Sequence, residues 1–113
     1  MGEHRDIRFD EVWERIRTLE GRTVPLAVRG RIEVLKVDVR GVLRRTSHGN
    51  MGLMSIDSFR WTVDALNRCD HLSRGQILEG IRRWESSGVV ATLAATGLYE
   101  LTRGPRVGLR IRR

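Results

Sequence analysis

The residue type best able to do chemistry in this chain is arginine. Of its 21 basic residues twenty are arginine and only Lys36 is lysine, and with 14 acidic residues the formal net charge is +7. A guanidinium group binds phosphate through paired hydrogen bonds and stacks on bases, so this excess of positive charge favours a nucleic-acid partner. A GC-rich genome would explain the arginine-to-lysine ratio equally well, but it would not explain the net charge.

Two segments supply the candidate phosphate contacts. The first is residues 74–83, and the second is the tail after Glu100, which contains no acidic residue. In the tail, strand alternation places Val107, Leu109 and Ile111 on one face and arginines on the other. We expect contacts to nucleic acid, with double-stranded DNA as the first choice, from Arg74, Arg82, Arg83, Arg103, Arg106, Arg110, Arg112 and Arg113. The alternative is a solvated basic surface or a protein interface, where arginine is also enriched.

Metal and covalent chemistry have weak support in the sequence. Cys69, Asp70 and His71 are adjacent, but a zinc site needs about three or four protein ligands and no second cluster supplies them. A restriction-type nuclease would place a lysine two residues after an acid, whereas Val34 stands two residues before Lys36. Glycine-rich phosphate loops and nucleophile elbows are absent from the sequence. We therefore expect no catalytic residue, no metal and no cofactor.

Composition indicates one intracellular domain. A chain of 113 residues with 40% hydrophobic residues can bury one modest core. Cys69 is the only cysteine, so an internal disulfide is excluded and a cytoplasmic location is favoured. No apolar run approaches the roughly 18 residues of a membrane span, and the N-terminal residues lack an apolar signal core.

The first half of the chain predicts one helix and a β-meander. Residues 1–8 are polar and expected to be flexible. Apolar residues at helical spacing predict a helix over 10–20, with Asp10 as N-cap and Gly21 as terminator. A three-stranded antiparallel meander is expected over 23–28, 32–39 and 42–46. Pro25 predicts that its first strand is an edge, and a slip in alternation at residues 35–36 predicts a bulge.

The second half predicts a loop, two helices and a C-terminal hairpin. Residues 47–54 are expected to be a loop, and Ser55 or Asp57 to cap a second helix. A third helix is expected over 74–87, opened by an S-x-x-Q capping box at Ser73 and ended by Gly88. Strands are expected over 89–93, 98–102 and 106–113. The alanines at 91, 94 and 95 favour a helix over 89–96 as the alternative.

The three tryptophans carry separate expectations. Trp13 and Trp84 lie on apolar helical stripes and are expected in the core. Trp61 lies off the apolar stripe of the second helix and is expected to pack against the protein or a dimer partner.

Two short motifs carry a resemblance to a known family. They are Trp84-Glu-Ser-Ser-Gly-Val89 and Tyr99-Glu-Leu-Thr-Arg-Gly104. With them, the chain from Ser73 onward resembles the second half of a winged-helix DNA-binding domain. The resemblance implies that the second helix begins a helix-turn-helix, that residues 74–87 enter the major groove, and that a wing touches phosphate.

These observations together predict one α+β domain over residues 1–113, with three helices and a small antiparallel sheet in a winged-helix-like arrangement. The predicted function is non-enzymatic nucleic-acid binding, with a homodimer as the expected assembly. One alternative is a homo-oligomeric protein-interaction module from a mobile element that does not bind nucleic acid. Another is a small enzyme whose site carries no recognised motif.

Overall fold

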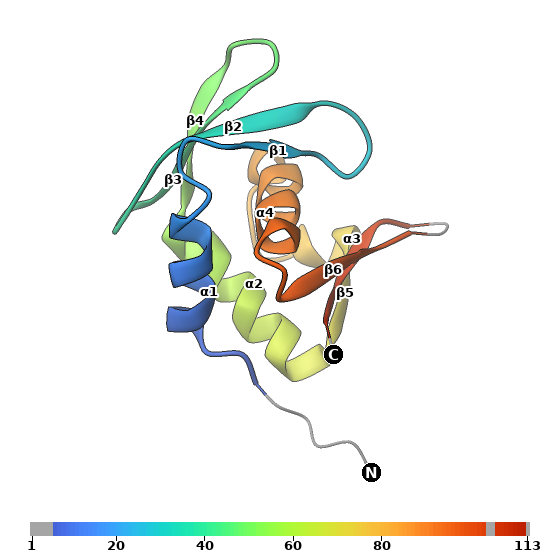
Figure 1. The fold of residues 1–113 in the computed structure, drawn as a ribbon. Helices are drawn as coiled ribbons and strands as arrows, with labels where there is room; N and C mark the ends of the chain where they lie inside the picture. Colours follow the sequence, from blue (N-terminus) through green and yellow to red (C-terminus); the bar gives the residue numbers. More distant parts are fainter. Residues whose placement is uncertain (1–5, 104–105, 113) are drawn as a thin grey trace.

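The computed structural model describes residues 6–103 and 106–112 and has an α+β architecture. Its helices are α1 (Phe9–Arg17), α2 (Ile56–Cys69), α3 (Arg74–Ile77) and α4 (Arg83–Ala95) (Figure 1). Its strands are β1 (Thr23–Pro25), β2 (Arg31–Asp38), β3 (Gly41–Thr46), β4 (Met51–Ser55), β5 (His71–Ser73), β6 (Tyr99–Thr102) and β7 (Gly108–Ile111). They form two antiparallel sheets, of order β1-β2-β3-β4 and β5-β7-β6. The α+β class is confirmed, with a fourth helix and a second sheet in the described residues.

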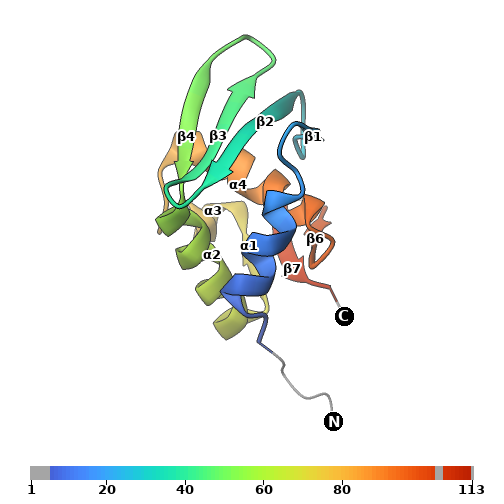
Figure 2. The same cartoon turned by 60° about the vertical axis from the view of Figure 1, so that its left-hand side comes forward.

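Helix α4 is the central element of the fold. It contacts α1, α2 and α3, and it also contacts strands of both sheets (Figure 1). Figure 2 shows the four-stranded sheet at one end of the molecule, with α1 and α2 beneath it. Val89, Val90 and Leu93 of α4 are almost completely buried, and burying such a side chain stabilises a fold by about 1.5–3 kcal/mol.

The helix expected over residues 74–87 is wrong, because the chain breaks it into α3 and α4 at residues 78–82. The predicted capping box is present: Ser73 Oγ accepts from the backbone N–H of Gln76, and the Gln76 side chain accepts from that of Ser73. The break falls at Gly80, where a Cβ atom would lie 2.0 Å from Cε2 of Trp61. The Trp61 indole therefore packs against the backbone of Gly80, which agrees with the expectation that Trp61 packs against the protein.

Gly88 does not end a helix, and the strand expected over 89–93 is also wrong. Both lie within α4, so the helical alternative for residues 89–96 is the correct one for most of that stretch. Gly88 is buried, and a Cβ atom there would lie 2.5 Å from the sulfur of Met54. Its missing side chain thus lets α4 approach β4 closely. This tertiary contact decides the structure against the local signal for a helix end.

Residues 47–54 are not all loop, because Met51–Ser55 form β4, which pairs with β3. Two features hold this glycine-containing segment extended. Met54 is fully buried, and the indole ring of Trp84 covers Gly52 so closely that a Cβ atom there would lie 3.0 Å from Cζ3.

Several local predictions are confirmed. β1 lies at the edge of its sheet, and the register shifts between Val34 and Lys36, where the bulge was expected. Ser55 caps α2 by accepting from the backbone N–H of Asp57. The N-cap expected at Asp10 is wrong: α1 begins at Phe9 with Arg8 as N-cap, and Asp10 lies within the first turn. The helix also ends at Arg17 rather than at residue 20.

The tryptophan predictions have mixed outcomes. Trp13 packs between Phe9 and Phe59, with both ring centroids 5.5 Å away. Trp84 is not a core residue, because 45% of its surface is exposed at the start of α4. It stacks instead on Arg44, whose guanidinium carbon lies 5.1 Å from the ring centroid.

Tyr99 offers a test of the core. Its side chain is fully buried, and its hydroxyl has no hydrogen-bond partner among the described residues. Burial raises the pKa of the phenol well above its ordinary value, and the negative charge of Glu11 adds to the rise. An unpaired buried hydroxyl costs free energy. We therefore expect Tyr99→Phe to leave the free energy of unfolding unchanged or to raise it by up to about 1 kcal/mol in urea denaturation. A loss above about 1 kcal/mol would contradict this account.

Candidate nucleic-acid interface

A small recess brings basic side chains together from distant parts of the chain. Arg29, in the loop between β1 and β2, and Arg74, at the start of α3, both line it. Ser87 and Val90 of α4 and Val107, just before β7, complete its walls with residues 26–28. None of the described residues that line the recess is acidic. The recess therefore has a positive potential that nothing in its own walls offsets.

Arg74 is held in place from two sides, by the residue before β7 and by α4. Its backbone N–H donates to the carbonyl of Val107 at 2.8 Å, which fixes the start of α3 to the residue just before β7. Its guanidinium donates to Ser87 Oγ at 2.9 Å and to Ser86 Oγ at 3.5 Å. The half-buried Arg74 is thus positioned without a carboxylate partner among the described residues.

Two more arginines come from the turn between β6 and β7. Figure 1 shows this hairpin on the same side of α4 as the β1–β2 loop. Arg103 ties the two together, since its Nη1 donates to the carbonyl of Ala27 at 3.3 Å. Arg106 is exposed and precedes Val107, which lines the recess.

Arg82 and Arg83 point to different sides of α4. Arg83 is exposed and lies one helical turn before Ser87, so it shares the helix face that borders the recess. Arg82 lines a different pocket, with Glu79 and Glu85 among its neighbours. The sequence placed both residues on one basic face, whereas the structure places Arg82 at another pocket and Arg83 on the helix face of Ser87.

The tail arginines at positions 110 and 112 lie at different sites. Arg110 forms an ion pair with Glu100 across the β6–β7 ladder, and both Nε and Nη2 donate to the same carboxylate oxygen. Arg112 lines a separate pocket near Asp6 and Glu11. Arg113 lies outside the described residues. The expected alternation holds, with Leu109 and Ile111 buried beneath these exposed arginines.

We call the surface formed by Arg29, Arg74, Arg83, Arg103 and Arg106 the basic face. Within the described part of the chain, none of these five residues forms an ion pair, whereas Arg40, Arg45 and Arg110 each pair with an acid. Arg29 was missing from the residues expected from sequence. It lies 45 positions before Arg74, and no pattern of spacing relates the two; only the tertiary packing does.

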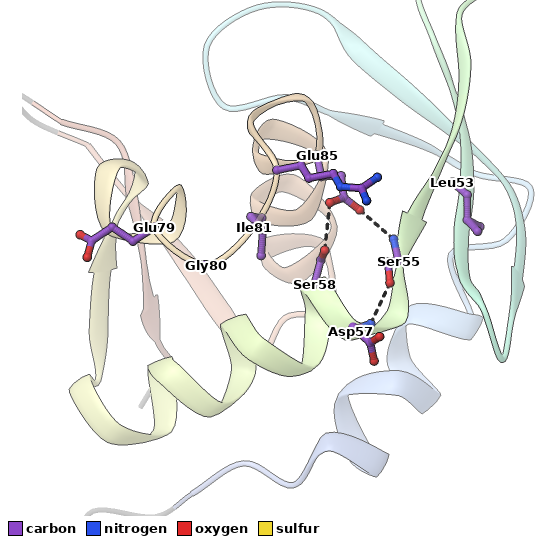
Figure 3. Close-up of a pocket in the computed structure, with 9 residues that line it drawn as sticks. Leu53, Ser55, Asp57, Ser58, Glu79, Gly80, Ile81 and Glu85 are labelled. Carbon is purple, nitrogen blue, oxygen red and sulfur yellow. Dashed lines mark hydrogen bonds between the residues drawn. The ribbon is translucent and has the colours of Figure 1, made fainter.

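A second candidate site is a polar cleft on another side of α4, with a volume of about 730 Å³. Asp57, Glu79 and Glu85 line it, but Figure 3 shows that Glu79 points away from Glu85. Both oxygens of Glu85 are already engaged, by the backbone N–H of Ser55 at 2.8 Å and by Ser58 Oγ at 3.0 Å (Figure 3). Among the described residues, no group of three or more potential ligands is arranged to hold a metal ion. This cleft therefore offers structural anchoring rather than an acid–base pair.

Arg44 illustrates a buried charge with a structural role. Its guanidinium donates to the carbonyl of Asn50 at 3.1 Å and stacks on Trp84. Burial lowers the pKa of Arg44, and the negative charge of Glu85 opposes that change. Arg44 thus belongs to the packing between β3 and α4 and is not part of the basic face.

Comparison with known proteins gives no relative from which a function could be transferred: no family model, curated protein or solved structure matches the chain significantly. Within the described residues, no helix is long and apolar enough to cross a membrane.

Proposed function

We propose that this protein binds nucleic acid without catalysis, with duplex DNA as its first-choice partner, through the basic face. One observation carries the proposal: Arg29 and Arg74 line one recess, Arg103 donates to its wall at Ala27, and none of the three is paired with an acid in the described structure. Arg83 and Arg106 lie one helical turn and one residue, respectively, from the wall residues Ser87 and Val107. Guanidinium groups without a carboxylate partner release counterions from a phosphate backbone when they bind it.

The winged-helix resemblance supports the same function once it is shifted by one element. With α2 as the first helix, the short β5 follows it, α3 and α4 come next, and β6 and β7 flank a wing. In this assignment α4, rather than residues 74–87, is the recognition helix. The N-terminal residues of such a helix contact DNA, and here they include Arg83.

The burial of α4 limits how much DNA sequence the protein could recognise. Both sheets and the other three helices contact α4, and its exposed surface is concentrated in its first turn. Few side chains could therefore reach base edges in a groove. We propose binding dominated by phosphate contacts, with little preference for sequence.

The salt dependence of binding tests the proposal. Each phosphate contact contributes a slope of about −0.9 when log affinity is plotted against log salt concentration. Three to five contacts from the basic face predict a slope of roughly −3 to −4.5 for a short duplex, measured by fluorescence anisotropy. Unrelated duplex sequences should differ in affinity by less than about tenfold, far below the ratios of sequence-specific proteins. No binding at low salt, or binding unaffected by salt, would refute the proposal.

A second candidate function is a homo-oligomeric interaction module, and the edge of the four-stranded sheet favours it. β4 is an edge strand that contains no charged residue and no proline. Natural proteins use charged residues and prolines to block pairing at such edges, so β4 is left open to a partner strand. Met51, the first residue of β4, is exposed, and so is Trp84, which packs on Gly52 of the same strand. Light scattering on the purified chain separates the two functions, because this one requires a stable oligomer whose mass is unchanged by duplex DNA.

A further inference from the structure

We propose that the recess between Arg29 and Arg74 is a dedicated site for a single phosphate group. This inference rests on the proposed function for the source of that group, a nucleic-acid backbone. It goes further by naming the one point on the basic face where a phosphate is enclosed. The other arginines of the basic face would act around it as exposed charges.

The size of the recess selects the ligand. Its volume is about 60 Å³, and a cavity needs roughly 10–15 Å³ on the same measure to hold one water molecule. The recess therefore admits about four to six water-sized groups, which is room for the four oxygens of one phosphate. A base or a whole nucleotide does not fit.

The walls of the recess combine charge with low polarity. Arg29 and Arg74 supply guanidinium groups, and Ser87 supplies a hydroxyl that already orients Arg74. The remaining walls are largely the apolar residues Leu26, Ala27, Val28, Val90 and Val107. Apolar surroundings strengthen the attraction between a guanidinium and an anion, because water screens them less.

The charge of Arg74 is not balanced by an acid among the described residues. Arg74 is half-buried, and no carboxylate in the described structure pairs with it. A cationic group taken partly out of water is costly to leave uncompensated. An anion in the recess would supply the missing charge, and paired N–H donors suit a phosphate better than a chloride ion.

The recess also exists only in the assembled fold. Its walls come from the β1–β2 loop, α3, α4 and the residue before β7, and the Arg103 bond to Ala27 holds the loop against the hairpin. Of the three polar residues in the walls, Arg74 and Ser87 are already held in place by their mutual hydrogen bond. Little side-chain entropy is therefore lost when a phosphate binds.

Titration of the full-length chain with sodium phosphate in a buffer without phosphate tests the site, with sodium chloride at equal ionic strength as reference. Backbone amide NMR signals of Val28, Ser87 and Val107 should shift saturably with phosphate and not with chloride. Arg29→Gln, an exposed loop change that leaves the Arg74 anchor intact, should weaken phosphate binding about tenfold, the value of one charged hydrogen bond. Arg82→Gln removes the same charge outside the recess and should leave phosphate binding unchanged.

The same variants, tested with a short DNA duplex, separate this inference from the proposed function. Equal shifts with phosphate and chloride, or equal phosphate affinity in Arg29→Gln and Arg82→Gln, would overturn the phosphate site even if duplex binding persists. Saturable phosphate shifts that depend on Arg29, in a chain that does not bind the duplex, would support the site and refute the proposed function.

Discussion

Replacing Gly41 with alanine is expected to remove at least about 3 kcal/mol of folding free energy. Gly41 joins β2 to β3 with φ of +144°, and an added Cβ atom would lie 2.0 Å from the carbonyl oxygen of Met54 and 2.8 Å from the backbone nitrogen of Ile56. Both neighbours are backbone atoms, at the point where β4 runs into α2, so neither can rotate away. For a domain of ordinary stability, about 5–15 kcal/mol, this is a large fraction of the total.

Urea unfolding measures the effect, and Gly49→Ala is the matched control. Gly49 also has a positive φ, of +88°, but nothing lies within 4 Å of the position of its missing Cβ atom. The control therefore carries only the backbone strain of about 1–2 kcal/mol. Equal losses at Gly41 and Gly49 would show that the close approach of Met54 and Ile56 is not a constraint.

Replacing Glu85 with alanine is expected to destabilise the fold by about 3 kcal/mol. Glu85 is 2% exposed and links α4 to the start of α2 through the Ser55 N–H and the Ser58 hydroxyl. Its loss leaves one buried and one part-buried donor unsatisfied, and it removes the negative charge that acts on the buried Arg44. Glu85→Gln keeps an acceptor in place and should lose less, about 1–2 kcal/mol.

Thermal or urea denaturation compares these variants with Glu79→Ala. Glu79 lines the same pocket but is exposed, so its replacement should change the stability by no more than about 0.5 kcal/mol. If Glu85→Ala were as mild as Glu79→Ala, the carboxylate would not be the anchor between α2 and α4.

Local signals in the sequence predicted the elements whose structure local chemistry decides. The capping box at Ser73, the N-cap at Ser55, the edge strand at Pro25 and the bulge after Val34 all depend on residues close in sequence. The failures occur where a distant residue intervenes. Trp61 covers Gly80 at the break after α3, and Met54 occupies the space beside Gly88.

The candidate interface follows the same division. The alternation of residues in the tail correctly predicted that Arg106 and Arg110 are exposed. It could not predict that Glu100 on the neighbouring strand pairs with Arg110. Helical spacing placed Arg82 and Arg83 on one face because a single helix was expected over residues 74–87, whereas α4 begins only at Arg83. Arg29 could join the basic face only through the contact of its loop with the β6–β7 hairpin, which no sequence period encodes.

The most direct measurement compares duplex DNA affinity in two double variants of equal charge. Arg83→Gln with Arg106→Gln removes two charges from the basic face, and Arg40→Gln with Arg45→Gln removes two arginines that are already paired with Asp38 and Glu33. Each pair lowers the net charge by two, from +7 to +5. We predict that the first double variant binds at least about tenfold more weakly and that its salt slope is shallower by about 2, while the second changes affinity less than about twofold. Equal weakening in the two variants would mean that overall charge, and not the basic face, attracts the DNA, and it would contradict this account.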